Sequence, residues 1–168
     1  GVRALDAGAS TGGFTDCLLQ RGAARVIAVD VGRALLHERL RSDPRVLVLE
    51  GVHVRDASTA ADLSAVDLVV ADLSFISACS AVAAAAPWLP EGGDVVVLVK
   101  PQFEAPRREA DRGAGVVTDP DVVAAAVARV EACAAREGLE VAGRTPSRVP
   151  GRRGNVEFFL HLRRPARF

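Results

Sequence analysis

One lysine, Lys100, ends an apolar run, and the other 20 of the 21 basic residues of the chain are arginine. A coding bias against lysine would explain this ratio, but it does not explain why a lysine remains at this position. Arginine keeps its proton in proteins, whereas lysine can lose it. Open α/β sheets place their ligands at the carboxyl ends of strands. We therefore expect Lys100 to serve a reaction at the end of a buried strand.

Two carboxylates can join this lysine. Asp72 ends an earlier apolar run, and Glu157 lies just inside the last one. If the three strands are neighbours, the three side chains converge into a catalytic group. Taken singly, Asp72 could cap a helix, Lys100 could be a surface lysine and Glu157 could be a charge at the sheet edge. Three such residues at strand ends nevertheless favour a site. Lys100 would then act as a base, or as an ammonium that orients a hydroxyl and stabilises negative charge.

A glycine-rich turn at residues 8–13 follows the first apolar run. Glycine lets the backbone approach a ligand and leaves helix amides pointing at it. The turn lacks both the dinucleotide spacing and the P-loop lysine, and the flanking carboxylates suit a cationic amino-acid group better than a phosphate. This pattern favours S-adenosylmethionine over NAD or ATP. Cofactor contacts are predicted from Asp6, Gly8, Ser10, Thr11, Gly12, Gly13, Phe14, Asp30, Val31, Glu50, Asp72 and Leu73, with Asp30 on the ribose hydroxyls.

Short β-branched runs alternate with alanine-rich stretches of helical period, which predicts a doubly wound α/β fold. Strands are expected at residues 2–6, 25–30, 46–50, 67–73, 94–100, 139–144 and 156–163. Helices are expected at residues 14–22, 33–41, 77–89 and 119–137, the last capped by Asp119 before Pro120. The last two strands have no helix between them, so they should pair antiparallel. Residues 102–117 are expected to form a mobile loop over the strand ends.

The charges of the chain are unevenly distributed although its net charge is zero. Residues 50–138 carry 7 basic and 14 acidic groups, whereas residues 139–168 carry 7 arginines against two glutamates. The basic end is a candidate contact for a polyanion, with a solvated tail as the ordinary alternative. The candidate RNA-binding residues are Arg144, Arg148, Arg152 and Arg153, around the turn at residues 146–154.

The length of 168 residues fits one domain. The chain begins at Gly1, almost inside a core strand, so we expect an upstream part of the protein. Cys17, Cys79 and Cys133 are widely spaced and form no ligand pattern, which predicts reduced thiols and an intracellular protein. Since no apolar run approaches membrane-spanning length, we expect a cytoplasmic monomer with no metal and no membrane partner.

The whole chain resembles the catalytic domain of the TlyA family of ribosomal RNA methyltransferases, itself similar to the FtsJ/RrmJ 2′-O-methyltransferases. The segments that carry the resemblance are residues 5–16, 69–77, 98–104 and 150–159. The resemblance implies a seven-stranded Rossmann-like S-adenosylmethionine methyltransferase fold, mostly parallel with an antiparallel last strand. It also implies methyl transfer to a cytidine ribose 2′-oxygen in ribosomal RNA. Of the family's Lys-Asp-Lys-Glu tetrad, Asp72, Lys100 and Glu157 match the last three members. The first lysine and a small RNA-binding domain are expected upstream of Gly1.

Departures from the family pattern concern the adenine pocket, where Val52 and His53 replace Thr-Asn and Arg33 replaces an aromatic residue. Three other functions are considered: a non-catalytic RNA-binding or ribosome-assembly module, a small-molecule methyltransferase, and a haemolysin-like protein. The complete set of Asp72, Lys100 and Glu157 argues against the first. The arginine-rich end favours a large anionic substrate over a small molecule. Pore formation has no support, because the sequence shows neither an amphipathic membrane stripe nor a signal sequence.

Overall fold

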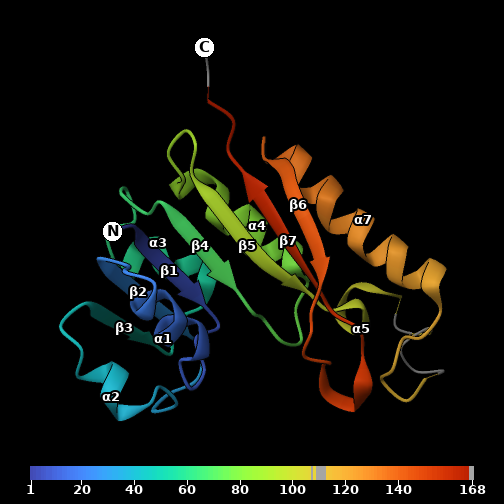
Figure 1. Ribbon diagram of the computed structural model, residues 1–168, viewed down its shortest axis with the longest axis horizontal. Helices are drawn as coiled ribbons and strands as arrows, with labels where there is room; N and C mark the ends of the chain where they lie inside the picture. Colours follow the sequence, from blue (N-terminus) through green and yellow to red (C-terminus); the bar gives the residue numbers. More distant parts are fainter. Residues whose placement is uncertain (107, 109–112, 167–168) are drawn as a thin grey trace.

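The computed structural model describes residues 1–106, 108 and 113–166 (Figure 1). Its centre is one seven-stranded sheet in the order β3-β2-β1-β4-β5-β7-β6. The first five strands are parallel, and β7 runs antiparallel between β5 and β6. The predicted fold class is thereby confirmed. The strands are β1 (Arg3–Ala7), β2 (Arg25–Asp30), β3 (Val46–Glu50), β4 (Leu68–Ala71), β5 (Asp94–Val99), β6 (Glu140–Pro146) and β7 (Phe158–Arg163).

Helices cover both faces of the sheet, and two separate cores result. Along β2, Ile27 and Val29 belong to a core that also contains residues of α4 and α7, whereas Val26 and Ala28 belong to a core with residues of α1 and α2. Because alternate residues of a strand point to opposite faces, the two cores lie on opposite sides. Parallel strands buried on both faces are mostly apolar, and the buried positions of β1 and β2 are apolar apart from Asp6. The helices are α1 (Gly13–Gln20), α2 (Glu38–Arg41), α3 (Ala57–Ala60), α4 (Ala78–Ala85), α5 (Pro101–Glu104) and α7 (Pro120–Arg136).

Most predicted elements are present with small shifts at their ends. The strands at residues 25–30 and 46–50 match β2 and β3, and Asp119 caps α7 by accepting the Asp121 amide at 2.9 Å. The last strand begins at Phe158, so Glu157 precedes β7 instead of lying inside it. The helix expected at residues 77–89 is α4, extended by a 3₁₀ turn over Ala86–Trp88.

The helix predicted at residues 33–41 is wrong over its first half, since α2 covers only Glu38–Arg41. Ala34 has a φ of +55°, in the left-handed region, so the backbone leaves the right-handed helical path inside the predicted first turn. The amides around it are held by carboxylates from the ends of two strands. Asp30 accepts from the Gly32 amide at 2.7 Å, and Glu50 accepts from the amides of Ala34 and Leu35.

The loop predicted at residues 102–117 is also partly wrong. Its first residues belong to α5, which directly follows Lys100. Its end is fixed by the buried Asn155, whose side chain accepts from the Val117 amide at 2.9 Å and donates to the Gly115 carbonyl at 2.8 Å. Residues 107 and 109–112 of the predicted loop lie outside the described residues.

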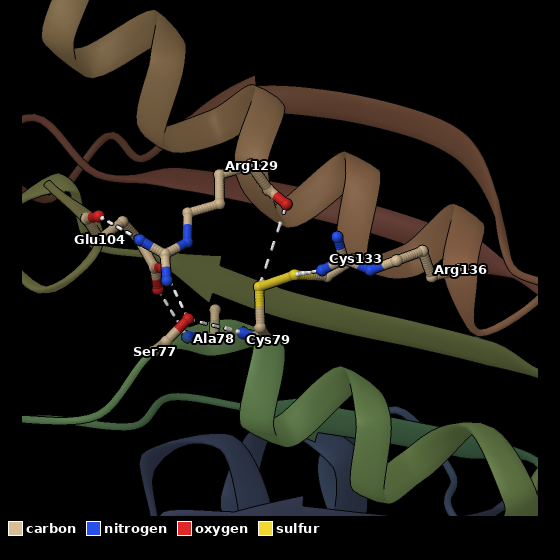
Figure 2. Close-up of a disulfide and its surroundings, with 7 residues drawn as sticks. All are labelled: Ser77, Ala78, Cys79, Glu104, Arg129, Cys133 and Arg136. Atoms are coloured by element: carbon tan, nitrogen blue, oxygen red, sulfur yellow. Dashed lines mark hydrogen bonds between the residues drawn. A yellow bond between two sulfur atoms is a disulfide. The ribbon is translucent and has the colours of Figure 1, made fainter.

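The prediction of three reduced thiols is wrong as well, because Cys79 and Cys133 form a disulfide with a Cα–Cα distance of 5.7 Å (Figure 2). The two residues are 54 positions apart in sequence. They come together because α4 and α7 pack side by side over the same core. Cys17 is free and exposed. Within the described ranges, no helix has the length and apolar character needed to cross a membrane.

Candidate active site

Lys100 and Asp72 form an ion pair at the carboxyl ends of two neighbouring parallel strands, β5 and β4. The Lys100 Nζ lies 2.5 Å from Asp72 Oδ1 and donates to the Ser74 hydroxyl at 3.2 Å. The lysine side chain is 12% exposed and the aspartate side chain 37% exposed. Opposite charges this close attract each other strongly where one of them is largely removed from water. The pair is therefore fixed in position, with the solvent-accessible part on the side of Asp72.

Glu157 lies at the same edge of the sheet. The ladder between β5 and β7 ends with the pair Val99 and Phe158, and Lys100 and Glu157 are the next residues beyond that pair. The Glu157 carboxylate is buried and accepts from Gln102 Nε2 at 3.0 Å. No ion pair between Glu157 and Lys100 occurs in the described part of the chain. The structure thus brings the three predicted residues to one edge, with Glu157 held by Gln102.

Asp6 is a fully buried carboxylate below the glycine turn. Its Oδ2 accepts from the Thr15 hydroxyl at 2.7 Å, while its buried Oδ1 has no hydrogen-bond partner. Burial raises the pKa of Asp6 to about 6, against the bonds from Thr15 that lower it, and the charges of Asp72 and Asp30 raise it further. Buried polar atoms in proteins nearly always have a partner. An unpartnered carboxylate oxygen near two other carboxylates is suited to a cationic ligand group.

The glycine turn approaches the end of β4 closely. Gly8 has a φ of +83°, and a Cβ there would lie 2.3 Å from the carbonyl oxygen of Asp72, so only glycine fits. The turn is also tied to β2, because Asp30 Oδ2 accepts from the Ser10 amide at 2.8 Å. Each oxygen of Asp30 therefore already holds one amide, and each keeps a lone pair for a ligand hydroxyl.

The other predicted cofactor residues differ in their availability. Val31, next to Asp30, is 67% exposed and presents an apolar surface at the end of β2. Glu50 is instead used within the protein, since its hydrogen bond with Arg41 at 2.5 Å is the main reason that its pKa is lowered. Leu73 and Phe14 are half-buried, and Thr11 and Gly13 are exposed, whereas Gly12 is buried against the side chains of α2 and the loop before it.

Phe75 is a candidate that the sequence analysis missed. Its side chain is 84% exposed, its backbone has a φ of +68°, and its ring centroid lies 5.3 Å from that of Phe103. A left-handed conformation costs a residue with a Cβ roughly 1–2 kcal/mol, and such strain is concentrated at functional sites. Phe75 directly follows Ser74, which accepts a hydrogen bond from Lys100. The signal was an aromatic residue within residues 69–77, but its exposure depends on backbone angles.

The four predicted RNA-binding arginines surround the connection between β6 and β7. Arg148 is exposed, and Arg144 pairs with Glu131 of α7 at 3.7 Å. Arg153 donates to the Ala114 carbonyl and so helps to fix the residues before α7. The side chain of Arg152 lies outside the described residues. Across the described ranges, no group of three His, Cys, Asp or Glu side chains is arranged to hold a metal ion.

Comparison with known proteins gives the same family over nearly the whole chain. The family model for FtsJ-like methyltransferases matches residues 1–164. The 16S/23S rRNA (cytidine-2′-O)-methyltransferase TlyA of Mycobacterium tuberculosis is 50% identical over 163 residues, which are 97% of this chain and 60% of that protein. Hemolysin A of Brachyspira hyodysenteriae is 36% identical over 163 residues, 94% of this chain and 66% of that protein. The chain thus spans about three fifths of the length of these curated relatives.

Solved structures agree with the fold. A Streptococcus thermophilus protein provisionally named a hemolysin has a TM-score of 0.92 and 41% identity, covering 98% of this chain and 59% of that one. An S-adenosylmethionine-dependent methyltransferase from Mesorhizobium loti has a TM-score of 0.64 at 15% identity, covering 98% of this chain and 91% of that one. At that identity the likeness concerns the fold alone.

Proposed function

The chain belongs to the FtsJ-like methyltransferase family, and we propose that it transfers a methyl group from S-adenosylmethionine to the 2′-hydroxyl of a cytidine ribose in ribosomal RNA. The observation that supports this most is the buried end of Lys100, paired with Asp72 beside a glycine turn and an exposed aromatic ring. The relative from Mycobacterium tuberculosis is named for methylation of the same substrate class. Residues 1–168 are proposed to form a single methyltransferase domain of a longer cytoplasmic protein.

The residues around the glycine turn fit S-adenosylmethionine. When bound, this cofactor supplies a sulfonium-activated methyl group. We assign its ammonium group to the unpartnered Oδ1 of Asp6 and its ribose hydroxyls to Asp30, because these carboxylates have acceptor capacity left. Val31 offers an apolar contact for the adenine. Gly8 allows the turn to lie against Asp72 without a side chain in the way.

Lys100 is assigned the role of orienting the nucleophilic oxygen. An ammonium has three hydrogens. Ser74 accepts one of them, and the Asp72 carboxylate holds the ammonium in an ion pair. A remaining hydrogen is assigned to the ribose 2′-oxygen. A donor fixed in this way offsets the negative charge that develops as the hydroxyl passes its proton to the Glu157 carboxylate, and it holds the oxygen in line for the displacement. Glu157 can accept a second hydrogen bond from the same ribose.

The RNA side of the site is assigned to Phe75 and the nearby arginines. Exposed aromatic rings stack on unpaired bases in RNA-binding proteins, and the Phe75 ring is the most exposed large apolar side chain of the described residues. Arg144, Arg148 and Arg152 are proposed to contact phosphates, which orient an RNA without reading its sequence. Arg153 has a smaller part in this role, because it already holds Ala114.

The test of this function is methyl transfer by the full-length protein. Ribosomal subunits that lack the modification are incubated with the protein and isotopically labelled S-adenosylmethionine, and the label in ribosomal RNA is counted. We expect the label to enter the RNA, and Asp72→Asn to slow its entry by about 100-fold or more, because Lys100 loses its charged partner. An unaltered protein that leaves the RNA unlabelled would contradict the proposal.

A further inference from the structure

Glu104 is a buried carboxylate that the proposed mechanism does not use. It ends α5, four residues after Lys100, and is 3% exposed. Its Oε2 accepts from the Ser77 hydroxyl at 2.7 Å, and its Oε1 accepts from the Ala78 amide at 2.6 Å (Figure 2). Ser77 caps α4 by accepting from the Cys79 amide at 3.1 Å. One carboxylate from the end of α5 therefore fixes the first residues of α4.

This carboxylate completes a series of contacts between two segments, residues 72–78 after β4 and residues 100–104 after β5. Lys100 contacts Asp72 and Ser74 at the start of the series. The rings of Phe103 and Phe75 meet in the middle, and Glu104 holds the far end. Because the contacts follow the same order along both segments, the two segments are aligned along their whole length.

The α7 helix supports the far end of this series. The Glu104 carbonyl accepts from Arg129 Nη1 at 3.2 Å, and the disulfide joins Cys79 of α4 to Cys133 of the same helix (Figure 2). Both segments are thus attached to α7 close to Glu104. The Glu104 carboxylate therefore has a fixed position. Through its hydrogen bonds it also fixes the positions of Ser77 and Ala78.

Phe75 lies between the two attachment points of the first segment. Ser74 on one side is bound by Lys100, and Ser77 on the other side is bound by Glu104. A left-handed conformation at an exposed phenylalanine persists only where the neighbouring structure holds it. Lys100 is expected to contact the substrate oxygen, whereas Glu104 is buried and away from solvent.

We propose that Glu104 is a positioning residue, which fixes the ring of Phe75 at the correct distance from Lys100 so that the RNA base and the ribose oxygen are held together. This inference rests on the proposed RNA methylation. Glu104 acts through Ser77 and the Phe75 ring, and it touches neither substrate nor cofactor. Its removal leaves the reacting groups in place but changes the distance between them. A misplacement of about 1 Å can slow an enzyme by about 100-fold.

The test is a double-mutant cycle in the full-length protein with ribosomal RNA as substrate. Glu104→Gln nearly preserves volume, but it cannot accept both bonds. We expect it to lower kcat/KM by about 10- to 100-fold, with unchanged affinity for S-adenosylmethionine. In a Phe75→Ala background the same change should lower kcat/KM by less than about threefold, since residues acting as a unit are not additive. An equal loss in both backgrounds overturns the proposal.

Asp94→Asn is the control, because it likewise replaces a hydrogen-bonded carboxylate. Asp94 is half-buried, accepts three bonds and lies at the opposite end of β5. We expect it to keep kcat/KM although it lowers the melting temperature. If it lowers kcat/KM as much as Glu104→Gln does, the Glu104 effect is only one of stability and the proposal fails. Ser77→Ala, which removes one of the two bonds, should give a smaller loss in the same direction, and a loss of zero contradicts the proposal. Failure of the unaltered protein to methylate RNA would instead overturn the proposed function itself.

Discussion

The two ends of β5 carry charged residues of similar types in very different surroundings. At the amino end, Asp94 accepts from His161 at 2.6 Å and from Arg163 at 2.8 and 3.2 Å. Both partners come from the adjacent strand β7, and the register pairs Asp94 directly with Arg163. Burial raises the pKa of Asp94, but the hydrogen bonds outweigh it and the pKa is lowered. This cluster satisfies itself and needs no ligand.

The carboxyl end is not satisfied in this way. Asp6 has a buried oxygen without a bond, and Phe75 is both strained and exposed. Unpaired buried groups and backbone strain raise the free energy of the folded protein. Both are found at the edge where ligands bind in open α/β sheets. The types of charged residue are similar at the two ends. The candidate site differs from an ordinary surface cluster by its unpaired buried oxygen and its strained backbone.

The largest effect should come from Lys100→Arg. This variant keeps the positive charge but replaces a compact ammonium with a planar group that cannot occupy the same contacts. We expect methyl transfer to fall by about 100-fold or more, with little change in melting temperature or cofactor affinity. Transfer rates and thermal melting of the full-length protein measure both. Substantial activity of the variant would mean that charge alone is required there and would remove the contrast between the two ends.

Gly8→Ala should have the next largest effect. Its Cβ would lie 2.3 Å from the Asp72 carbonyl oxygen, and its φ of +83° is strained for alanine. We expect a loss of about 2–4 kcal/mol in the free energy of unfolding and a loss of cofactor binding. Gly143→Ala is the control, because a Cβ at Gly143 meets nothing within 4 Å and its φ is ordinary. Equal denaturation midpoints for the two variants would refute the close approach of the turn to β4.

The pH dependence of stability should differ in sign between the two ends of the sheet. The pKa of Asp6 is raised from 3.8 to about 6, so between these values the folded state binds more protons than the unfolded state. Stability should then fall as the pH rises toward about 6 and stay level above it. The pKa of Asp94 is lowered, so its contribution is present above about pH 4 and is lost as the pH falls through the lowered pKa.

Chemical denaturation at a series of pH values measures these two contributions. Asp6→Asn should remove the fall between about pH 4 and 6, which corresponds to up to about 3 kcal/mol. Asp94→Asn should leave that fall unchanged and remove only the loss at lower pH. If Asp6→Asn has the same pH profile as the unaltered protein, burial of the charged Asp6 carboxylate does not lower the stability of the folded protein as we expect.

The smallest effect is expected for Arg148→Gln. An arginine that contacts one phosphate contributes about 0.7–0.9 to the slope of log affinity against log salt. Losing Arg148 should reduce the slope by that amount without changing cofactor affinity. RNA binding is measured by titration at several salt concentrations. Arg45→Gln is the control, because Arg45 is paired with Asp43 in a surface turn. Equal slopes for the two variants would show that Arg148 contacts no phosphate.

The sequence predicted the strands and their neighbours well for a physical reason. Parallel strands covered by helices have nearly continuous apolar runs. The buried strand at residues 25–30 and the half-buried edge strand at residues 46–50 were therefore found with correct bounds. The antiparallel pairing of β6 with β7 followed from the missing helix between them. The convergence of Asp72 with Lys100 followed in turn from the order of the strands.

The missed features depend on contacts that a local pattern does not contain. The first half of the predicted helix at residues 33–41 is interrupted at Ala34, which has a left-handed φ of +55°. The disulfide joins Cys79 and Cys133 across 54 residues. Phe75 became a candidate only through its backbone angle and its exposure. Each of these needs the tertiary structure.

The most direct test of the proposed ribose methylation is to identify the methylated nucleoside. Ribosomal RNA methylated by the full-length protein with labelled S-adenosylmethionine is digested to nucleosides, which are separated and identified by mass spectrometry. We predict that the label is found in 2′-O-methylcytidine and that Lys100→Arg lowers it by about 100-fold or more. Label in a nucleoside methylated on its base would contradict the assignment of Lys100 to a ribose oxygen.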